Sequence, residues 1–299
     1  MTCDTSALKA SDVLSLVNTH DQQALIKSVH AHFLTGQGFT VATLNLDHIV
    51  KLRQQPAFRD AYAHHSHVVA DGNPIVWLRR VMGQPVALVP GSELVMPLAD
   101  LARQADVPVA LLGATDATLA LAAERMQADL PGLRIVARIA PPFGFDPSGA
   151  VADRILSDLA ASGARLCFLA LGAPKQEILA IRGAEKLPQC GFVSIGAGLD
   201  FIAGTQQRAP AWVRRIAMEW FWRMATNPIR LTQRYAQCFA ILPGLFWSAR
   251  RARIARRNKA KTRKALHLRL LFNNFTRNVS KTGNHSTRGQ RIGCKTSSF

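Results

Sequence analysis

The chain has few cysteines, no evident signal-peptide pattern and no long apolar run. Its five cysteines are widely spaced and form no C-x-x-C pair, so we expect reduced thiols, without a disulfide framework or a zinc ribbon. Residues 1–12 have neither the basic nor the apolar part of a signal peptide. No apolar run reaches the roughly 18 residues that a spanning helix needs, and the longest, residues 236–249, contains Pro243 and Gly244. We therefore expect a soluble or peripheral membrane protein in a reducing compartment.

Acidic residues are almost absent from the last third of the chain. Residues 1–204 contain 16 Lys and Arg and 18 Asp and Glu, a net charge of −2. Residues 205–299 contain 21 Lys and Arg against one acid, Glu219, a net charge of +20. Hydrophobic residues make up 48% of the 299 residues, which is typical of a globular protein. This distribution excludes a uniformly basic, histone-like protein and indicates a near-neutral body followed by a basic segment.

Short apolar runs alternate with segments of helical spacing between residues 39 and 200. Several runs are apolar at consecutive positions, which is typical of strands covered on both faces. Such β-α-β repeats predict a Rossmann-like α/β fold, an open and mostly parallel sheet with helices on both faces, in which ligands bind beyond the carboxyl ends of the strands. The expected strands are 39–44, 67–70, 86–89, 107–112, 133–139, 166–171 and 191–195, and the expected helices are 74–82, 92–104, 115–129, 148–162 and 175–186.

Composition divides the chain into four parts. Residues 1–38 are predicted as an α-rich lead-in and residues 39–204 as the α/β catalytic core. Residues 205–257 are predicted as a basic helical appendage rich in Trp and Arg. Residues 258–299 are polar and basic, without the apolar residues of a core, and are predicted as a disordered tail.

Two polar side chains follow expected strands. Asn45 can donate and accept hydrogen bonds at the carboxyl edge of the sheet, although capping of the next helix by Asn45 or Asp47 is the simpler interpretation. Asp71, in an Asp-Gly-Asn-Pro turn, can act as a general base on an attacking hydroxyl, and a plain turn residue is an equally good interpretation. With an ordinary pKa near 3.9, such a base is weak unless it is partly buried.

Small residues follow three other expected strands, at Gly113-Ala114, Gly172-Ala173-Pro174 and Gly196-Ala197-Gly198. Such loops let backbone N–H groups approach a diphosphate, or they form only tight turns. None is a Walker A loop or a G-x-G-x-x-G fingerprint, and no D-x-D metal clamp occurs. Together they favour a phosphate-bearing ligand, and we expect no metal and no cofactor. The histidines at 64, 65 and 67 are interpreted as surface residues rather than metal ligands.

Seven sequence blocks follow one another along the chain, and the ADG, GAPKQE, RAP-W and EW-x-x-R patterns among them are specific when taken together. The seven blocks are TLNLDH (43–48), VVADGNPIVW (68–77), PGSEL (90–94), LLGA (111–114), LGAPKQE (171–177), IGAGLDFIAGTQQRAPAW (195–212) and EWFWRMATNPIRLTQRY (219–235). In this order, over about residues 38–236, the chain resembles the WecG/TagA/CpsF glycosyltransferase family. The resemblance implies an inverting, metal-independent hexosyltransferase that moves a sugar from a UDP-sugar to a polyprenyl-diphosphate-linked saccharide for cell-surface polysaccharide or exopolysaccharide synthesis. The implied sugar is N-acetylmannosamine, its uronic acid or glucose.

The resemblance also implies roles for particular residues. Asp71 falls on the general base, with Thr43 and Asn45 beside it, and the appendage would dock on the membrane and bring Arg208 and Arg223 over the active site. The expected substrate- and nucleotide-binding residues are Gly113, Gly172, Lys175, Gln176, Glu177, Gly196, Gly198, Asp200, Arg230 and Arg234. Gly113-Ala114 departs from the two glycines that the family often has at this loop.

The expected partners are a UDP-sugar, a polyprenyl-diphosphate-linked saccharide and the anionic inner face of the bacterial cytoplasmic membrane, without nucleic acid. The resemblance implies a homo-oligomer as well, although no interface is evident in the sequence. Two other classes stay open. A Rossmann-type nucleotide-dependent oxidoreductase explains the α/β pattern but lacks the glycine fingerprint. A nucleic-acid-binding protein explains only the basic segment.

Overall fold

The computed structural model describes residues 10–207, 209–210, 213, 222 and 228–283. The chain divides into two compact units, one ending at Arg250 and one beginning at Arg251. Two predicted catalytic residues, Arg208 and Arg223, lie outside the described residues.

The first unit is built on a six-stranded sheet in the order β2-β1-β6-β5-β3-β4, and every adjacent pair of strands is parallel. Four of the six strands are buried along their whole length, as their consecutive apolar residues predict. The predicted α/β open sheet is therefore confirmed. The strands are β1 (Phe39–Leu44), β2 (His67–Ala70), β3 (Val109–Gly113), β4 (Ile135–Ile139), β5 (Leu166–Ala170) and β6 (Gly191–Ser194).

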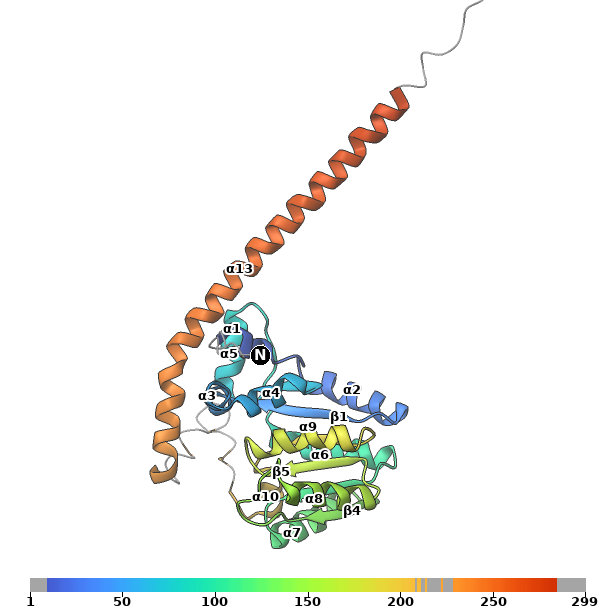
Figure 1. Cartoon of the computed structure of the whole chain (residues 1–299), viewed down its shortest axis with the longest axis vertical. Helices are drawn as coiled ribbons and strands as arrows, with labels where there is room; N and C mark the ends of the chain where they lie inside the picture. The colour runs from blue at the N-terminus through green and yellow to red at the C-terminus, as the bar shows by residue number, and fades with distance from the viewer. Residues whose placement is uncertain (1–9, 208, 211–212, 214–221, 223–227, 284–299) are drawn as a thin grey trace, which may run out of the picture. The chain divides into compact units, whose positions relative to one another are not determined.

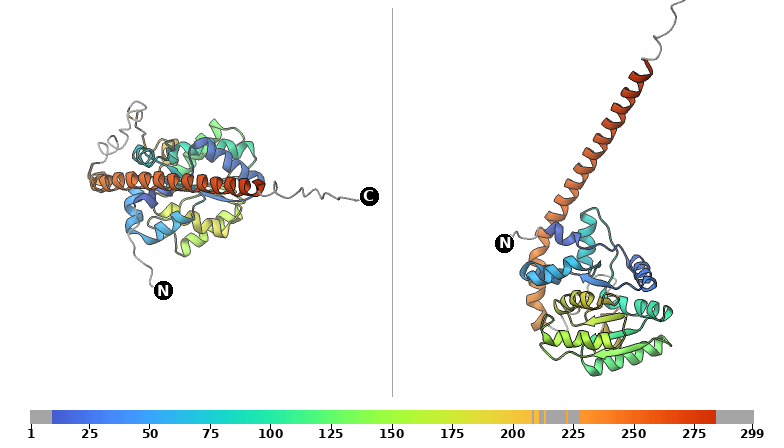
Figure 2. Two further views of the ribbon diagram at one scale, coloured as in Figure 1. Left: turned by 90° about the horizontal axis from the view of Figure 1, so that it is seen from above. Right: turned by 45° about the vertical axis from the view of Figure 1, so that its right-hand side comes forward.

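Helices cover both faces of the sheet (Figures 1 and 2). On one face, α2 (Gln22–Thr35), α6 (Gly91–Gln104), α7 (Asp116–Asp129) and α10 (Gly198–Ala203) share a buried apolar cluster with alternate strand residues. On the other face, α8 (Ala150–Ala161) and α9 (Lys175–Lys186) pack against the intervening strand residues. This division follows from the alternation of side chains along a strand. The remaining helices are α1 (Ala10–Ser15), α3 (Leu46–Gln54), α4 (Pro56–His64), α5 (Asn73–Val81) and α13 (Pro228–Gly283).

The strand predicted over residues 86–89 is wrong. These residues connect α5 to α6 without joining the sheet. The backbone N–H of Ala87 donates to His20 O and that of Val89 to Ala70 O, each at 2.8 Å. Because the two bonds go to different segments, they do not form a ladder. The run is apolar without being a strand because Val89 belongs to the buried core.

Helix α13 continues through the predicted boundary at residue 257. Residues 258–283, part of the segment predicted as a tail, continue this helix. The segment is rich in Leu, Lys and Arg, which favour helix, and no Gly or Pro interrupts the chain between Gly244 and Gly283. In the part of the chain that the structure describes, no helix is long and apolar enough to cross a bilayer.

Candidate active site

A cavity of about 1880 Å³ lies at the carboxyl ends of β2, β1, β6 and β5. Each of these strands places a predicted site residue in its lining: Asp71 after β2, Asn45 after β1, Gly196 after β6 and Gly172 after β5. The first turns of α13, which run beside α3 in Figures 1 and 2, contribute residues from Arg234 to Trp247. The cavity therefore lies where a parallel sheet is expected to bind its ligand.

Asp71 and Asn45 meet because β1 and β2 are paired neighbours, with Leu44 opposite Ala70. The Nδ2 amide of Asn45 donates to Asp71 Oδ2 at 3.3 Å. Asn45 Oδ1 accepts the backbone N–H of His48 at 3.0 Å, so Asn45 also caps α3. Both interpretations of Asn45 are therefore correct, since the capping bond turns the NH₂ group toward the carboxylate.

A buried hydrogen-bond chain supports the loop behind this pair. The hydroxyl of Tyr62 donates to Thr43 O at 2.8 Å and lies 2.7 Å from His48 Nδ1. Because the single hydroxyl hydrogen goes to Thr43, His48 carries its proton on Nδ1 and donates it to Tyr62. Burial lowers the pKa of His48 to about 4, so this histidine is neutral at physiological pH. Thr43 itself is buried and lines the cavity.

Cationic groups converge on Asp47, in the first turn of α3. Arg234 Nε lies 2.7 Å from Asp47 Oδ1, and Lys51 Nζ lies 2.9 Å from Asp47 Oδ2. Lys51 also donates to Ala173 O at 2.9 Å, in the loop after β5. Burial raises the pKa of Asp47, but Arg234 and Lys51 outweigh it, so the pKa is lowered and the carboxylate stays ionised. Asp47 thus ties α13 and the β5–α9 loop to α3.

Gln176 connects the loops after β5 and β6. Its side chain is buried, accepts the Gly196 N–H at 3.1 Å and donates to Glu177 Oε1 at 2.8 Å. The Gly196 N–H that the sequence predicts for phosphate is therefore bonded to Gln176. Burial raises the pKa of Glu177 to about 7, against the opposing hydrogen bond from Gln176. Gly172 adopts φ 70°, and a Cβ there would meet nothing within 4 Å.

The other predicted site residues differ in their relation to the cavity. Gly113 is a packing position outside the cavity lining, since a Cβ there would lie 2.4 Å from Ala170 O. Lys175 Nζ lies 5.0 Å from the centroid of the Phe145 ring. Asp200 lines the cavity, burial raises its pKa, and its Oδ1 accepts from Thr205 Oγ1 at 3.3 Å. Arg230 belongs to α13, but its side chain lies outside what the structure describes.

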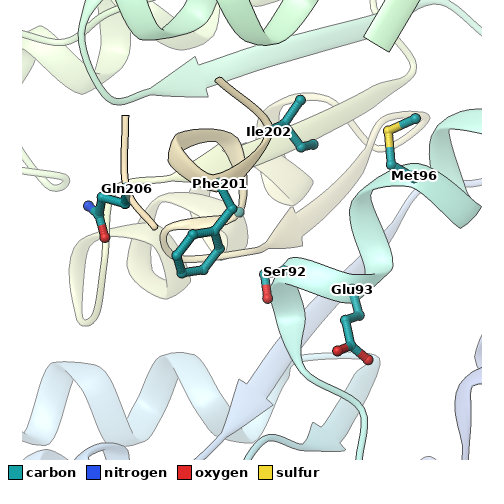
Figure 3. Close-up of a pocket in the computed structure, with 7 residues that line it drawn as sticks. Ser92, Glu93, Met96, Phe201, Ile202 and Gln206 are labelled. Carbon is teal, nitrogen blue, oxygen red and sulfur yellow. The ribbon is translucent and has the colours of Figure 1, made fainter. Parts of the chain in front are cut away.

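A smaller pocket of about 400 Å³ lies between α6 and α10, which face each other in Figure 3. Met96 and Ile202 form its apolar part, and the Phe201 ring lies between α10 and Ser92 (Figure 3). Gly198, predicted to bind nucleotide, lines this pocket. Four lining residues are shared with the main cavity, so the smaller pocket is a side recess of it: Ser92, Glu93, Phe201 and Gln206.

The histidines after α4 do not form a metal site. His65 is buried against Tyr62, with ring centroids 5.8 Å apart, so its interpretation as a surface residue is wrong. His67 Nε2 lies 2.8 Å from Ser28 Oγ. Within the described ranges, no three His, Cys, Asp or Glu side chains are grouped so that they could hold a metal ion.

The cluster around Asp47 is a functional feature that the sequence patterns above do not predict. They indicate Asp47 only as a helix cap and give Lys51 no role. The available signal was their i, i+4 spacing on one helix, which places opposite charges side by side. The contact with Arg234 had no local signal, because the partners are far apart in the chain.

A large cavity at the carboxyl edge of a parallel sheet, with a carboxylate and two cationic side chains in its lining, is typical of the ligand site of an α/β enzyme. The chain belongs to the glycosyl transferase WecG/TagA/CpsF family, whose model matches residues 12–259, and it is a hexosyltransferase. This assignment favours the glycosyltransferase over the oxidoreductase and nucleic-acid-binding alternatives.

Two relatives carry the same name, N-acetylglucosaminyldiphosphoundecaprenol N-acetyl-beta-D-mannosaminyltransferase. The chain is 29% identical to the protein of Bacillus spizizenii over 196 residues, which cover 65% of this chain and 74% of the relative. It is 34% identical to the protein of Bacillus subtilis over 84 residues, which cover 27% of this chain and 33% of the relative.

Proposed function

We propose that the protein transfers a sugar from a UDP-sugar to a saccharide linked to polyprenyl diphosphate, with inversion and without a metal. The observation that carries this proposal is the Asp71 carboxylate, held by Asn45 in a cavity that also contains Lys51 and Arg234. The names of both relatives support N-acetylmannosamine as the sugar and an undecaprenyl-diphosphate-linked N-acetylglucosamine as the acceptor. The uronic acid of N-acetylmannosamine and glucose are the other donor sugars to be tested.

In the proposed reaction, Asp71 accepts the proton of the acceptor hydroxyl while the hydroxyl oxygen attacks the anomeric carbon. The bond between that carbon and the UDP oxygen breaks on the opposite face, so the configuration inverts. The hydrogen bond from Asn45 fixes the direction of the carboxylate. General-base catalysis of this kind contributes about 10²–10⁴-fold to the rate.

The departing UDP needs positive charge near its diphosphate. The N-terminus of the 14-residue helix α6 supplies it at Gly91 and Ser92, where the positive end of the helix dipole meets the cavity. Arg208 and Arg223 are proposed to add further charge. With these groups, the transfer proceeds without a metal ion in our proposal.

We also propose that the protein works at the inner face of the bacterial cytoplasmic membrane, where a polyprenyl acceptor would lie. Residues 251–299 contain 14 Lys and Arg and no acid. Each basic residue near an anionic lipid surface contributes about 1 kcal/mol, so this segment supplies peripheral attachment. The homo-oligomer stays a prediction.

The test is Asp71→Asn, assayed with each of the three UDP-sugars and an undecaprenyl-diphosphate-linked N-acetylglucosamine acceptor. We expect turnover to fall about 10²–10⁴-fold while the thermal unfolding midpoint stays unchanged. Asp60→Asn is the matched control, because Asp60 has a side chain that is 79% exposed, on α4. Wild-type turnover in Asp71→Asn would remove Asp71 from the mechanism.

Two further measurements test the rest of the proposal. NMR of the product should show a β-linkage formed from an α-linked donor, and retention would exclude the inverting mechanism. Turnover should persist in EDTA. A loss in EDTA that Mg²⁺ restores would contradict metal independence.

A further inference from the structure

Large apolar side chains gather in the main cavity. Ten large apolar side chains are exposed in the described part of the chain, and half of them line this one cavity. Their exposed fractions run from 40% to 59%. A concentration of this kind marks a surface that binds an apolar partner. The five are Trp77, Leu88, Phe239, Phe246 and Trp247.

Three of them belong to a continuous stripe on α13. Cavity-lining residues recur there at helical intervals from Tyr235 to Trp247, which is one face of a helix about 18 Å long. Leu245 and Ala249 are completely buried, so this stretch of α13 is held in place by packing while the stripe beside them lines the cavity. Trp77 and Leu88 approach the same cavity from α5 and from the α5–α6 connection.

Polar and apolar groups follow one another along this wall. Arg234, paired with Asp47 and close in sequence to the stripe, marks the charged end. The apolar stripe follows and ends at Trp247, with the guanidinium of Arg250 6.0 Å from the Trp247 ring centroid. A ligand that matches this order has an anionic head and a hydrocarbon tail. A sugar nucleotide has no such tail.

We propose that this apolar wall binds the isoprenoid chain of the acceptor, next to its diphosphate. The inference rests on the proposed function, because it assigns the cavity's apolar wall to that acceptor. Lys51 and Arg234 then lie at the diphosphate end, and Trp77, Phe246 and Trp247 contact the first isoprene units. The wall therefore selects lipid-linked over water-soluble acceptors.

The test compares the binding of farnesyl diphosphate and inorganic diphosphate to the full chain by calorimetry, without any donor sugar. We expect farnesyl diphosphate to bind more tightly. Trp77→Ala and Phe246→Ala should each weaken farnesyl diphosphate about tenfold, equivalent to about 1.4 kcal/mol, and leave inorganic diphosphate unchanged. Phe143→Ala, an exposed aromatic outside the cavity, should change neither.

Equal affinity of the wild type for both probes would overturn the proposal, as would wild-type behaviour of both alanine variants. Sedimentation with phosphatidylglycerol liposomes provides a further arm. If both variants lose liposome binding but still prefer farnesyl diphosphate, the wall contacts membrane lipid and the proposal is wrong. Because the binding assay needs no transfer, a wild type that prefers farnesyl diphosphate but transfers no sugar would contradict only the proposed function.

Discussion

At the scale of single residues, Asn45 performs two tasks that a substitution can separate. Its Oδ1 caps α3, and its Nδ2 donates to Asp71. Ser caps a helix about as well as Asn does, but it has no amide to reach a second partner. We therefore expect stability and the proposed catalysis to depend on different atoms of the same side chain.

We expect Asn45→Ser to keep the free energy of unfolding within about 0.5 kcal/mol while turnover falls, and Asn45→Ala to cost about 1 kcal/mol of stability as well. The amide hydrogen bond fixes the direction of the Asp71 carboxylate, so kcat/KM should fall in both variants. Urea unfolding and steady-state kinetics measure the two effects. A wild-type kcat/KM in Asn45→Ser would show that Asn45 does not act on Asp71.

A second prediction at this scale concerns the protonation of Glu177 and its effect on stability. Burial raises the pKa of Glu177 to about 7 in the folded protein, from an ordinary value of 4.5. Between pH 4.5 and about 7, Glu177 therefore keeps its proton in the folded state and has lost it in the unfolded state. The free energy of unfolding consequently falls as the pH rises through this range. Glu177→Gln removes this fall and keeps an acceptor for Gln176. Relative to wild type, the variant should gain up to about 3 kcal/mol between pH 4.5 and 7.5 in urea unfolding. A difference in unfolding free energy between Glu177→Gln and wild type that does not change with pH would contradict this prediction.

At the scale of elements, the sequence predicts what depends on local pattern. Buried strands reveal themselves by consecutive apolar residues, and Asp71 and Asn45 could be predicted because they directly follow such strands. The strand prediction over residues 86–89 is wrong because a buried connection that contains Val89 is as apolar as a strand. The link from Asp47 to Arg234 could not be predicted, since it depends on where α13 packs.

This link between elements can be measured by a double-mutant cycle. Asp47→Asn and Arg234→Gln should show a coupling energy of about 1–2 kcal/mol, because the Asp47 side chain is only 12% exposed and the ion pair is partly shielded from water. Hydrogen exchange in the described first turns of α13 should accelerate in both single variants. The exposed pair Asp106–Arg134, whose side chains are 80% and 51% exposed, is the matched control and should couple by less than about 0.5 kcal/mol. Equal coupling in the two pairs would mean that Asp47 does not hold α13.

At the scale of the whole molecule, the positive charge divides with the two units. Residues 1–250 contain 23 Lys and Arg and 19 acids, a net charge of +4, whereas residues 251–299 carry +14. The cavity and the sheet lie in the first unit. We therefore assign the proposed sugar transfer to the first unit and the proposed attraction to the membrane surface to residues 251–299.

A chain that ends at Arg250 tests this division. It retains every described lining residue of the cavity, so we expect its thermal unfolding midpoint and its turnover on a short-chain, detergent-free acceptor to match those of the full chain. Sedimentation with phosphatidylglycerol liposomes at low salt should be lost, because the +14 segment is gone. In the full chain, the same binding should weaken as salt screens the charges. If the shortened chain still sediments, the first unit itself holds the membrane, and the apolar wall of the cavity becomes the segment to mutate next.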